Sequence, residues 1–158
     1  MQPTNKKIVP ITPPAASASA ATFAAAPVDT VGFTHVEVYA VLGAVGAAMT
    51  ALKVQESDSL TAGALTAPAD VPGTVVGVDG SDGSATPSAF PGPAQANGVV
   101  KFEIDMRGRK RYLGLVATAG GGATFLTAFA LLGRGENSPT TAAQKNVALC
   151  MKNWPGGA

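Results

Sequence analysis

The sequence predicts an all-β protein, an antiparallel β-sandwich of jelly-roll type. Short segments alternate apolar and polar side chains with the period of two that a half-buried strand requires. These segments are separated by turns rich in glycine and proline, which contribute 19 and 12 of the 158 residues. Little of the chain has helical periodicity. Several short strands between such turns are typical of sandwiches and jelly rolls.

The first core strand is expected over residues 32–42. Val36, Val38, Ala40 and Leu42 share one face, and His35, Glu37 and Tyr39 share the other. Gly43 and Gly46 mark a turn, and residues 48–56 resume the alternation. The two segments therefore predict a β-hairpin.

The middle of the chain is expected to consist mainly of loops. Residues 57–70 are small and polar, with a short strand possible at 60–65. The β-branched residues at 74–78 predict a further strand, followed by a turn-rich loop over 79–84. Prolines then keep the chain extended or looped up to Val99.

Residues 99–132 contain the strongest strand pattern. Apolar side chains alternate with charged ones from Val100 to Met106, Arg107 and Gly108 supply a reversal, and residues 109–117 run back. The pattern predicts a second hairpin. A glycine triplet at 120–122 then leads into residues 123–132, which are apolar on both faces, so we expect this strand to be covered on both sides.

The two ends differ from the middle in composition. Residues 1–27 are dominated by Pro, Ala, Ser and Thr, and form an expected extended arm. The β-sandwich domain is assigned to residues 28–139 and a tail to 140–158, with a short helix expected over 141–151. Ile8, Val9, Ile11 and Phe23 could anchor the arm on a neighbouring subunit, and the alternative is a partly disordered tail.

Composition argues against several classes of function. Charged residues make up 13% of the chain and the formal net charge is +1, so no global field attracts a polyanion such as nucleic acid. The lone cysteine, Cys150, has neither a disulfide partner nor neighbours at metal-ligand spacing. A surface poor in charge is typical of proteins that meet other proteins.

Catalytic motifs are not evident in the sequence. The single histidine, His35, shares a strand face with Glu37, and we interpret the two as a solvated pair and not as a catalytic dyad. No nucleophile elbow or phosphate-binding loop occurs, and residues 79–84 lack the acidic spacing of a calcium loop. We therefore expect no enzymatic activity, cofactor or metal.

A membrane protein is the competing class. Residues 112–132 are uncharged over about the length of a bilayer crossing and follow the basic segment RGRKR. Three successive glycines would cost a helix about 3 kcal/mol relative to alanine, whereas they suit a connection between strands. The strand interpretation is therefore favoured.

The basic segment has three possible uses. Arg107, Arg109, Lys110 and Arg111 could contact phosphates, could pair with carboxylates of a partner protein, or could form a solvated turn. The near-neutral chain favours a protein partner over nucleic acid.

Three segments resemble a known family: ALKVQESDS at 51–59, FEIDMRGRKRYLGLVATAGGG at 102–122 and FALLGRGENSP at 129–139. They are similar to the head decoration, or cement, proteins that tailed bacteriophages encode beside the major capsid protein. The resemblance implies a jelly-roll or similar sandwich that assembles as a dimer or trimer on the outside of the phage head. It also implies that the protein bridges neighbouring capsomers.

On this basis the expected partners are the major capsid protein and other copies of the chain, without nucleic acid or membrane. Arg107, Arg109, Lys110 and Arg111 are expected to dock on acidic surfaces. Ile8, Val9, Ile11, Phe23 and Trp154 are expected to anchor the two ends. A tail or neck component with the same fold, and a small phage membrane protein with 112–132 inserted, remain as alternatives.

Overall fold

The computed structural model of the chain describes residues 6–14, 17–76 and 90–135. Among these, strands form nearly all of the regular structure, and one short 3-10 helix spans Pro93–Gln95. Cys150, Trp154, the expected loop at 79–84 and the expected helix at 141–151 lie outside the described residues.

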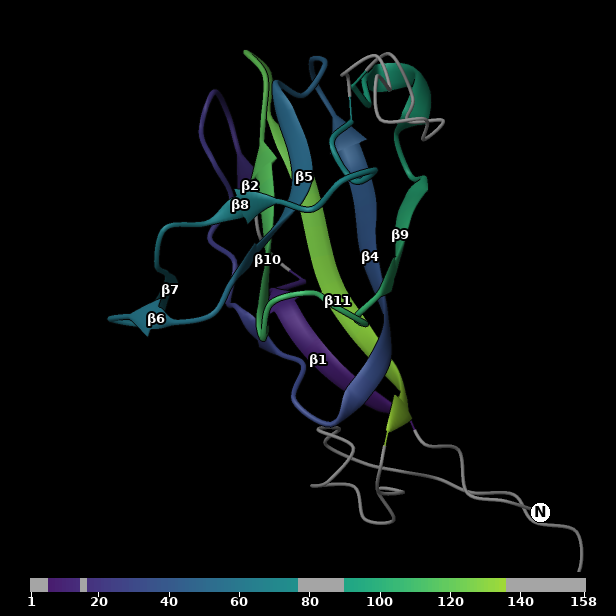
Figure 1. Cartoon of the computed structure of the whole chain (residues 1–158). Helices are drawn as coiled ribbons and strands as arrows, with labels where there is room; N and C mark the ends of the chain where they lie inside the picture. Colours follow the sequence, from purple (N-terminus) through teal and green to yellow (C-terminus); the bar gives the residue numbers. More distant parts are fainter. Residues whose placement is uncertain (1–5, 15–16, 77–89, 136–158) are drawn as a thin grey trace, which may run out of the picture.

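Two antiparallel sheets form the framework (Figure 1). Sheet A contains, in spatial order, β1 (Lys7–Thr12), β11 (Thr124–Gly135), β4 (Phe33–Val45) and β9 (Val99–Asp105), and β2 (Ser17–Ala18) also pairs with β11. Sheet B contains β3 (Val28–Asp29), β10 (Tyr112–Thr118), β5 (Ala51–Ser57) and β8 (Ala69–Asp70). A small hairpin of β6 (Leu60–Thr61) and β7 (Ala64–Leu65) projects from the sandwich.

The core lies between the two sheets and follows the apolar alternation. In sheet A most of the buried side chains belong to β4, β9 and β11, and in sheet B to β5 and β10, while β1 and β3 contribute Ile11 and Val28. They include Val36, Val38, Ala40, Leu42, Leu52, Val54, Phe102, Ile104, Leu113, Leu115, Leu126, Ala128, Ala130 and Leu132. The predicted all-β sandwich is therefore confirmed.

Both predicted hairpins are wrong, because their strands lie in different sheets. β4 pairs with β11 and β9, whereas β5 pairs with β10 and β8. The chain likewise crosses from β9 in sheet A to β10 in sheet B, and returns to sheet A in β11. The alternation that places one face in the core is the same for a hairpin and for a crossing. It therefore identifies a strand and its buried face without identifying its neighbour.

Two of the crossings pack against each other. Gly46 donates a backbone hydrogen bond to the Ala123 carbonyl at 2.8 Å, and Thr50 donates one to the Thr118 carbonyl at 2.9 Å. A Cβ atom on Gly120 would lie 2.1 Å from the Ala48 carbonyl oxygen. The glycine triplet therefore lets two backbones approach each other, as well as turning the chain.

The N-terminal segment is part of the sandwich, which corrects the expected boundary at residue 28. β1 pairs along β11, with Ile8 opposite Leu131 and Pro10 opposite Phe129. Ile11 and Phe23 are only 4% and 5% exposed, in the core of their own chain. The low hydrophobicity of residues 1–27 concealed this, because an edge strand needs few buried side chains.

The strand expected at 74–78 is not found in its described part, residues 74–76, where the Thr74 hydroxyl instead donates to the Val71 and Val54 carbonyls. Residues 77 and 78 lie outside the described residues. Within the single chain, β11 is covered by sheet B on one face, and on the other face its side chains are partly exposed, with Phe125 at 48%. Cover of that face by a partner remains an expectation. The described part of the chain contains no apolar helix of membrane-spanning length.

Candidate functional site

The connection between β9 and β10 carries the basic residues 107–111, here called the basic connection. It begins with a tight turn in which the Arg109 backbone N–H donates to the Met106 carbonyl at 3.0 Å. Gly108 has a φ of +74°, which favours glycine. The predicted reversal at Arg107 and Gly108 is therefore present, within a crossing between sheets.

Arg107 is held by a carboxylate of its own chain. Its Nε lies 3.0 and 2.9 Å from the two carboxylate oxygens of Asp105, and its backbone N–H donates to Asp105 Oδ1 at 3.0 Å. This contact raises the pKa of the guanidinium. The Arg107 side chain is nevertheless 80% exposed, so one side of it faces solvent.

Arg111 pairs with Asp29 at the end of β3. Arg111 Nε and Nη2 donate to the two Asp29 oxygens at 3.0 and 2.7 Å, the parallel geometry that fits a guanidinium to a carboxylate. The hydrogen bond to Arg111 lowers the pKa of Asp29. The guanidinium also lies 4.8 Å from the centre of the Tyr112 ring.

Glu56 binds the middle of the basic connection from β5. Its carboxylate accepts a hydrogen bond from the Lys110 backbone N–H at 3.2 Å and lies 3.6 Å from Arg109 Nη1. Glu56 is only 8% exposed, so this carboxylate is largely removed from solvent. Its contacts hold the connection close to sheet B.

The basic connection is thus mostly neutralised within the chain. Its four cations, Arg107, Arg109, Lys110 and Arg111, face three carboxylates, which leaves one positive charge. Within the described ranges, no carboxylate pairs with the Lys110 side chain. The groups of the basic connection that are most available to bind an acidic partner are the Lys110 side chain and the exposed side of Arg107.

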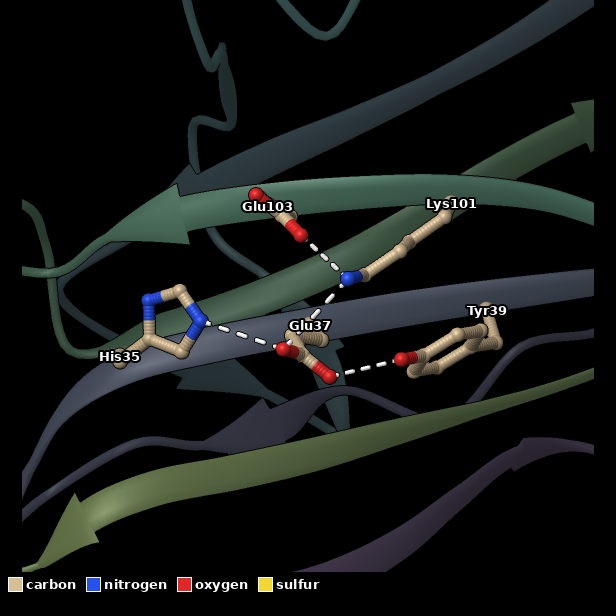
Figure 2. A network of polar contacts seen from close by, with 5 residues as sticks. All are labelled: His35, Glu37, Tyr39, Lys101 and Glu103. Atoms are coloured by element: carbon tan, nitrogen blue, oxygen red, sulfur yellow. Dashed lines mark hydrogen bonds and ion pairs between the residues drawn. The ribbon is translucent and has the colours of Figure 1, made fainter.

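A second polar cluster lies on the outward face of sheet A, here called the outer network (Figure 2). It consists of His35, Glu37 and Tyr39 from β4 and Lys101 and Glu103 from β9. Glu37 and Glu103 are directly opposite in register, an arrangement that is unfavourable for like charges. Lys101 contacts both carboxylates and lies 3.5 Å from Glu37 Oε1, so it compensates their repulsion.

Glu37 is the centre of the outer network. It accepts a 2.7 Å hydrogen bond from the Tyr39 hydroxyl, and His35 Nε2 lies 3.5 Å from its other oxygen. The Tyr39 bond is the main reason that the pKa of Glu37 is lowered and that of Tyr39 raised. His35 and Glu37 are in contact, as inferred from sequence, but their side chains are only 31% and 19% exposed, so the pair is half-buried and not fully solvated. The sequence did not identify Tyr39, Lys101 or Glu103 as their partners.

A row of side chains crosses sheet A beside this network. Tyr39 is in register with Lys101 on one side and Phe129 on the other, and Phe129 is in register with Pro10. The Tyr39 and Phe129 rings stack with centroids 5.1 Å apart, and Lys101 Nζ lies 5.7 Å from the Tyr39 ring centre. The outward face of sheet A is therefore polar over β9 and β4, and becomes aromatic from Tyr39 toward Phe129 in β11.

The apolar residues expected to bind a partner have different positions. Ile8 is 39% exposed on the outward side of β1, and Val9 is partly buried against the core. Ile11 and Phe23 are core residues, so they stabilise the chain itself. The exposed large apolar side chains that sequence analysis missed are Val31, Leu60, Val99 and Phe125.

No group of three or more His, Cys, Asp or Glu side chains could hold a metal ion in the part of the chain that the structure describes. Comparison with family models, curated proteins and solved structures finds no match to this chain.

Proposed function

We propose that the chain is a structural virion protein that binds the assembled head of a tailed phage and stabilises contacts between capsomers. The structural observation that supports the proposal is the strand order, which bears on the fold expected of such a protein. If the eight main strands are numbered along the chain, leaving out β2, β6 and β7, the sheets have the orders 1-8-3-6 and 2-7-4-5.

This order corresponds to one long antiparallel ribbon folded over on itself. The first strand pairs with the eighth, the second with the seventh, the third with the sixth and the fourth with the fifth. Such a ribbon rolled into two sheets is the connectivity of a jelly roll, an architecture of viral capsid and lectin domains. We therefore infer jelly-roll connectivity here.

One fold hosts many functions, so the particular function comes from the resemblance of residues 51–59, 102–122 and 129–139 to head decoration proteins. The surface is compatible with it. Most charges of the basic connection are paired within the chain, and exposed Val31, Val99 and Phe125 offer apolar contacts. A protein that binds only the assembled shell stabilises it by mass action, and many copies multiply a modest contact energy.

The test is sedimentation of the full chain with purified phage heads that lack it, beside unassembled capsid subunits. Binding to heads and not to subunits, with new density on the outer surface by electron microscopy, is the expected result. Absence of the chain from sedimented heads at saturating concentration would exclude the proposal.

The contribution of the basic connection is tested separately. Lys110→Glu and Arg107→Glu should lower occupancy on heads, because they place negative charge before an acidic surface. Lys53→Glu is the matched control. It also reverses a positive charge, but in sheet B and away from the basic connection, where Lys53 lies 2.9 Å from Asp70. Unchanged occupancy of both basic-connection variants would remove this surface from the interface.

A further inference from the structure

The four edges of the two sheets are not equivalent. Edge strands expose unpaired backbone groups, and proteins protect them with short strands, prolines or bulges. β3 and β8, at the edges of sheet B, have two residues each. β1 contains Pro10 and a register shift between Pro10 and Thr12. β9 has seven residues and an unshifted register with β4, without proline or glycine.

Among the described residues, no strand pairs with the side of β9 that faces away from β4, and the backbone groups on that side can be assigned. Met106 N–H donates to the Thr34 carbonyl at 3.0 Å, and Leu42 N–H donates to the Gly98 carbonyl at 2.9 Å. Even-numbered residues therefore direct their peptide groups to β4. Because successive residues alternate, Val99, Lys101 and Glu103 direct theirs away from β4, toward the open edge.

The side chains of the same residues are also accessible. Val99 is 59% exposed, and the Lys101 and Glu103 side chains are 37% and 60% exposed. The even-numbered residues Phe102 and Ile104 point into the core. The edge thus presents an apolar, a basic and an acidic side chain in succession on the outward face, with Phe102 and Ile104 in the core beneath.

Among the antiparallel registers of a second copy of β9 on this edge, one pairs opposite charges directly. Hydrogen-bonded pairing needs odd-numbered residues opposite odd-numbered residues. Centring the pair on Phe102 meets this condition and places Lys101 opposite Glu103 of the second copy, twice by symmetry. Centring it on Lys101 or on Glu103 would place like charges opposite each other, which is unfavourable.

We propose that two copies of the chain associate through β9, antiparallel and centred on Phe102, so that sheet A continues across a two-fold axis as one sheet. The Lys101 ammonium then pairs with Glu103 of the second copy while it still contacts Glu37 of its own chain. This proposal is independent of head binding, because a monomeric chain could still decorate a capsid.

Two charge variants test the register. Lys101→Glu leaves acidic residues at 101 and 103, and Glu103→Lys leaves basic residues at both, so each variant alone should repel its own copy. Mixed one to one, the two have complementary edges in the proposed register. We expect monomers for each variant and a dimer for the mixture by sedimentation velocity and native mass spectrometry. A fold damaged by either substitution would not be restored by mixing.

A backbone variant tests the edge itself. Glu103→Pro removes an N–H that points away from β4, so the pairing of β9 with β4 is retained while a second copy is excluded. We expect the dimer dissociation constant to rise at least about tenfold, and less for the control Glu103→Ala, which keeps the N–H.

Hydrogen exchange gives an independent measurement of the same edge. Protection of the Val99, Lys101 and Glu103 amides should increase with protein concentration. A wild-type chain that is monomeric at about 100 μM would overturn the proposal. If these amides are protected to the same degree at every protein concentration, another segment of the same chain covers the edge, and the proposal is wrong. A dimer unaffected by Glu103→Pro would place the interface elsewhere and equally exclude β9.

Discussion

At the scale of single residues, the basic connection shows how distant carboxylates decide the role of a charged segment. Asp29, Glu56 and Asp105 come from three strands and bind its arginines or its backbone. Asp105 is close in sequence to Arg107, so that pair could be found from sequence. Asp29 and Glu56 are remote from the segment, and only folding brings them to it.

Glu56 is the partner whose loss should be most costly. Glu56→Ala leaves the Lys110 N–H without its acceptor in a site where Glu56 is 8% exposed. We expect a loss of about 1–3 kcal/mol in the free energy of unfolding, measured by urea denaturation. Asp58→Ala, on an exposed neighbour, should change it by less than about 0.5 kcal/mol. Equal effects would show that Glu56 does not hold the connection.

The Asp29 pair predicts a dependence of stability on pH. Its pKa in the folded chain is below the ordinary value of 3.8, so the deprotonated form is favoured by folding. The stability from this pair is present above that value and is lost as pH falls through the folded pKa. Asp29→Asn should therefore flatten the acid limb of a plot of unfolding free energy against pH. An unchanged limb in the variant would contradict this assignment.

At the scale of elements, the three glycines at 120–122 have different roles that cannot be distinguished from the sequence. Gly120 and Gly122 each face backbone of residues 46–48 within 3 Å of an added Cβ, whereas Gly121 faces open space. All three look alike as a turn. Only the contact between the two crossings distinguishes them.

Alanine substitutions test this difference. Gly120→Ala requires the backbones to separate, and should destabilise the fold by about 1–3 kcal/mol. Gly121→Ala adds the same methyl group without a contact, so its effect should be within about 0.5 kcal/mol. Thermal and urea unfolding of the two variants provide the comparison. A Gly120 variant as stable as the Gly121 variant would mean that the crossings do not pack closely.

At the scale of the whole molecule, the N-terminal segment belongs to the sandwich. Ile11 and Ile8 are in the same strand, but Ile11 is 4% exposed and Ile8 is 39% exposed. Ile11→Ala should cost about 2–4 kcal/mol of unfolding free energy, and Ile8→Ala less than about 1 kcal/mol. An independent arm would leave stability unchanged in both variants. Urea denaturation of the isolated full chain distinguishes the two outcomes.

The sequence by itself determined the all-β class, most long strands and their buried faces, since alternation along one strand is a local property. It did not determine which strands are neighbours. Turns that end a hairpin and turns that cross between sheets use the same glycines and polar residues, and both preserve the alternation. Only the tertiary structure decided which strands pair, that β1 is an edge strand of sheet A, and that carboxylates of the same chain neutralise most of the basic connection. Each of these depends on contacts between residues that are far apart in the chain.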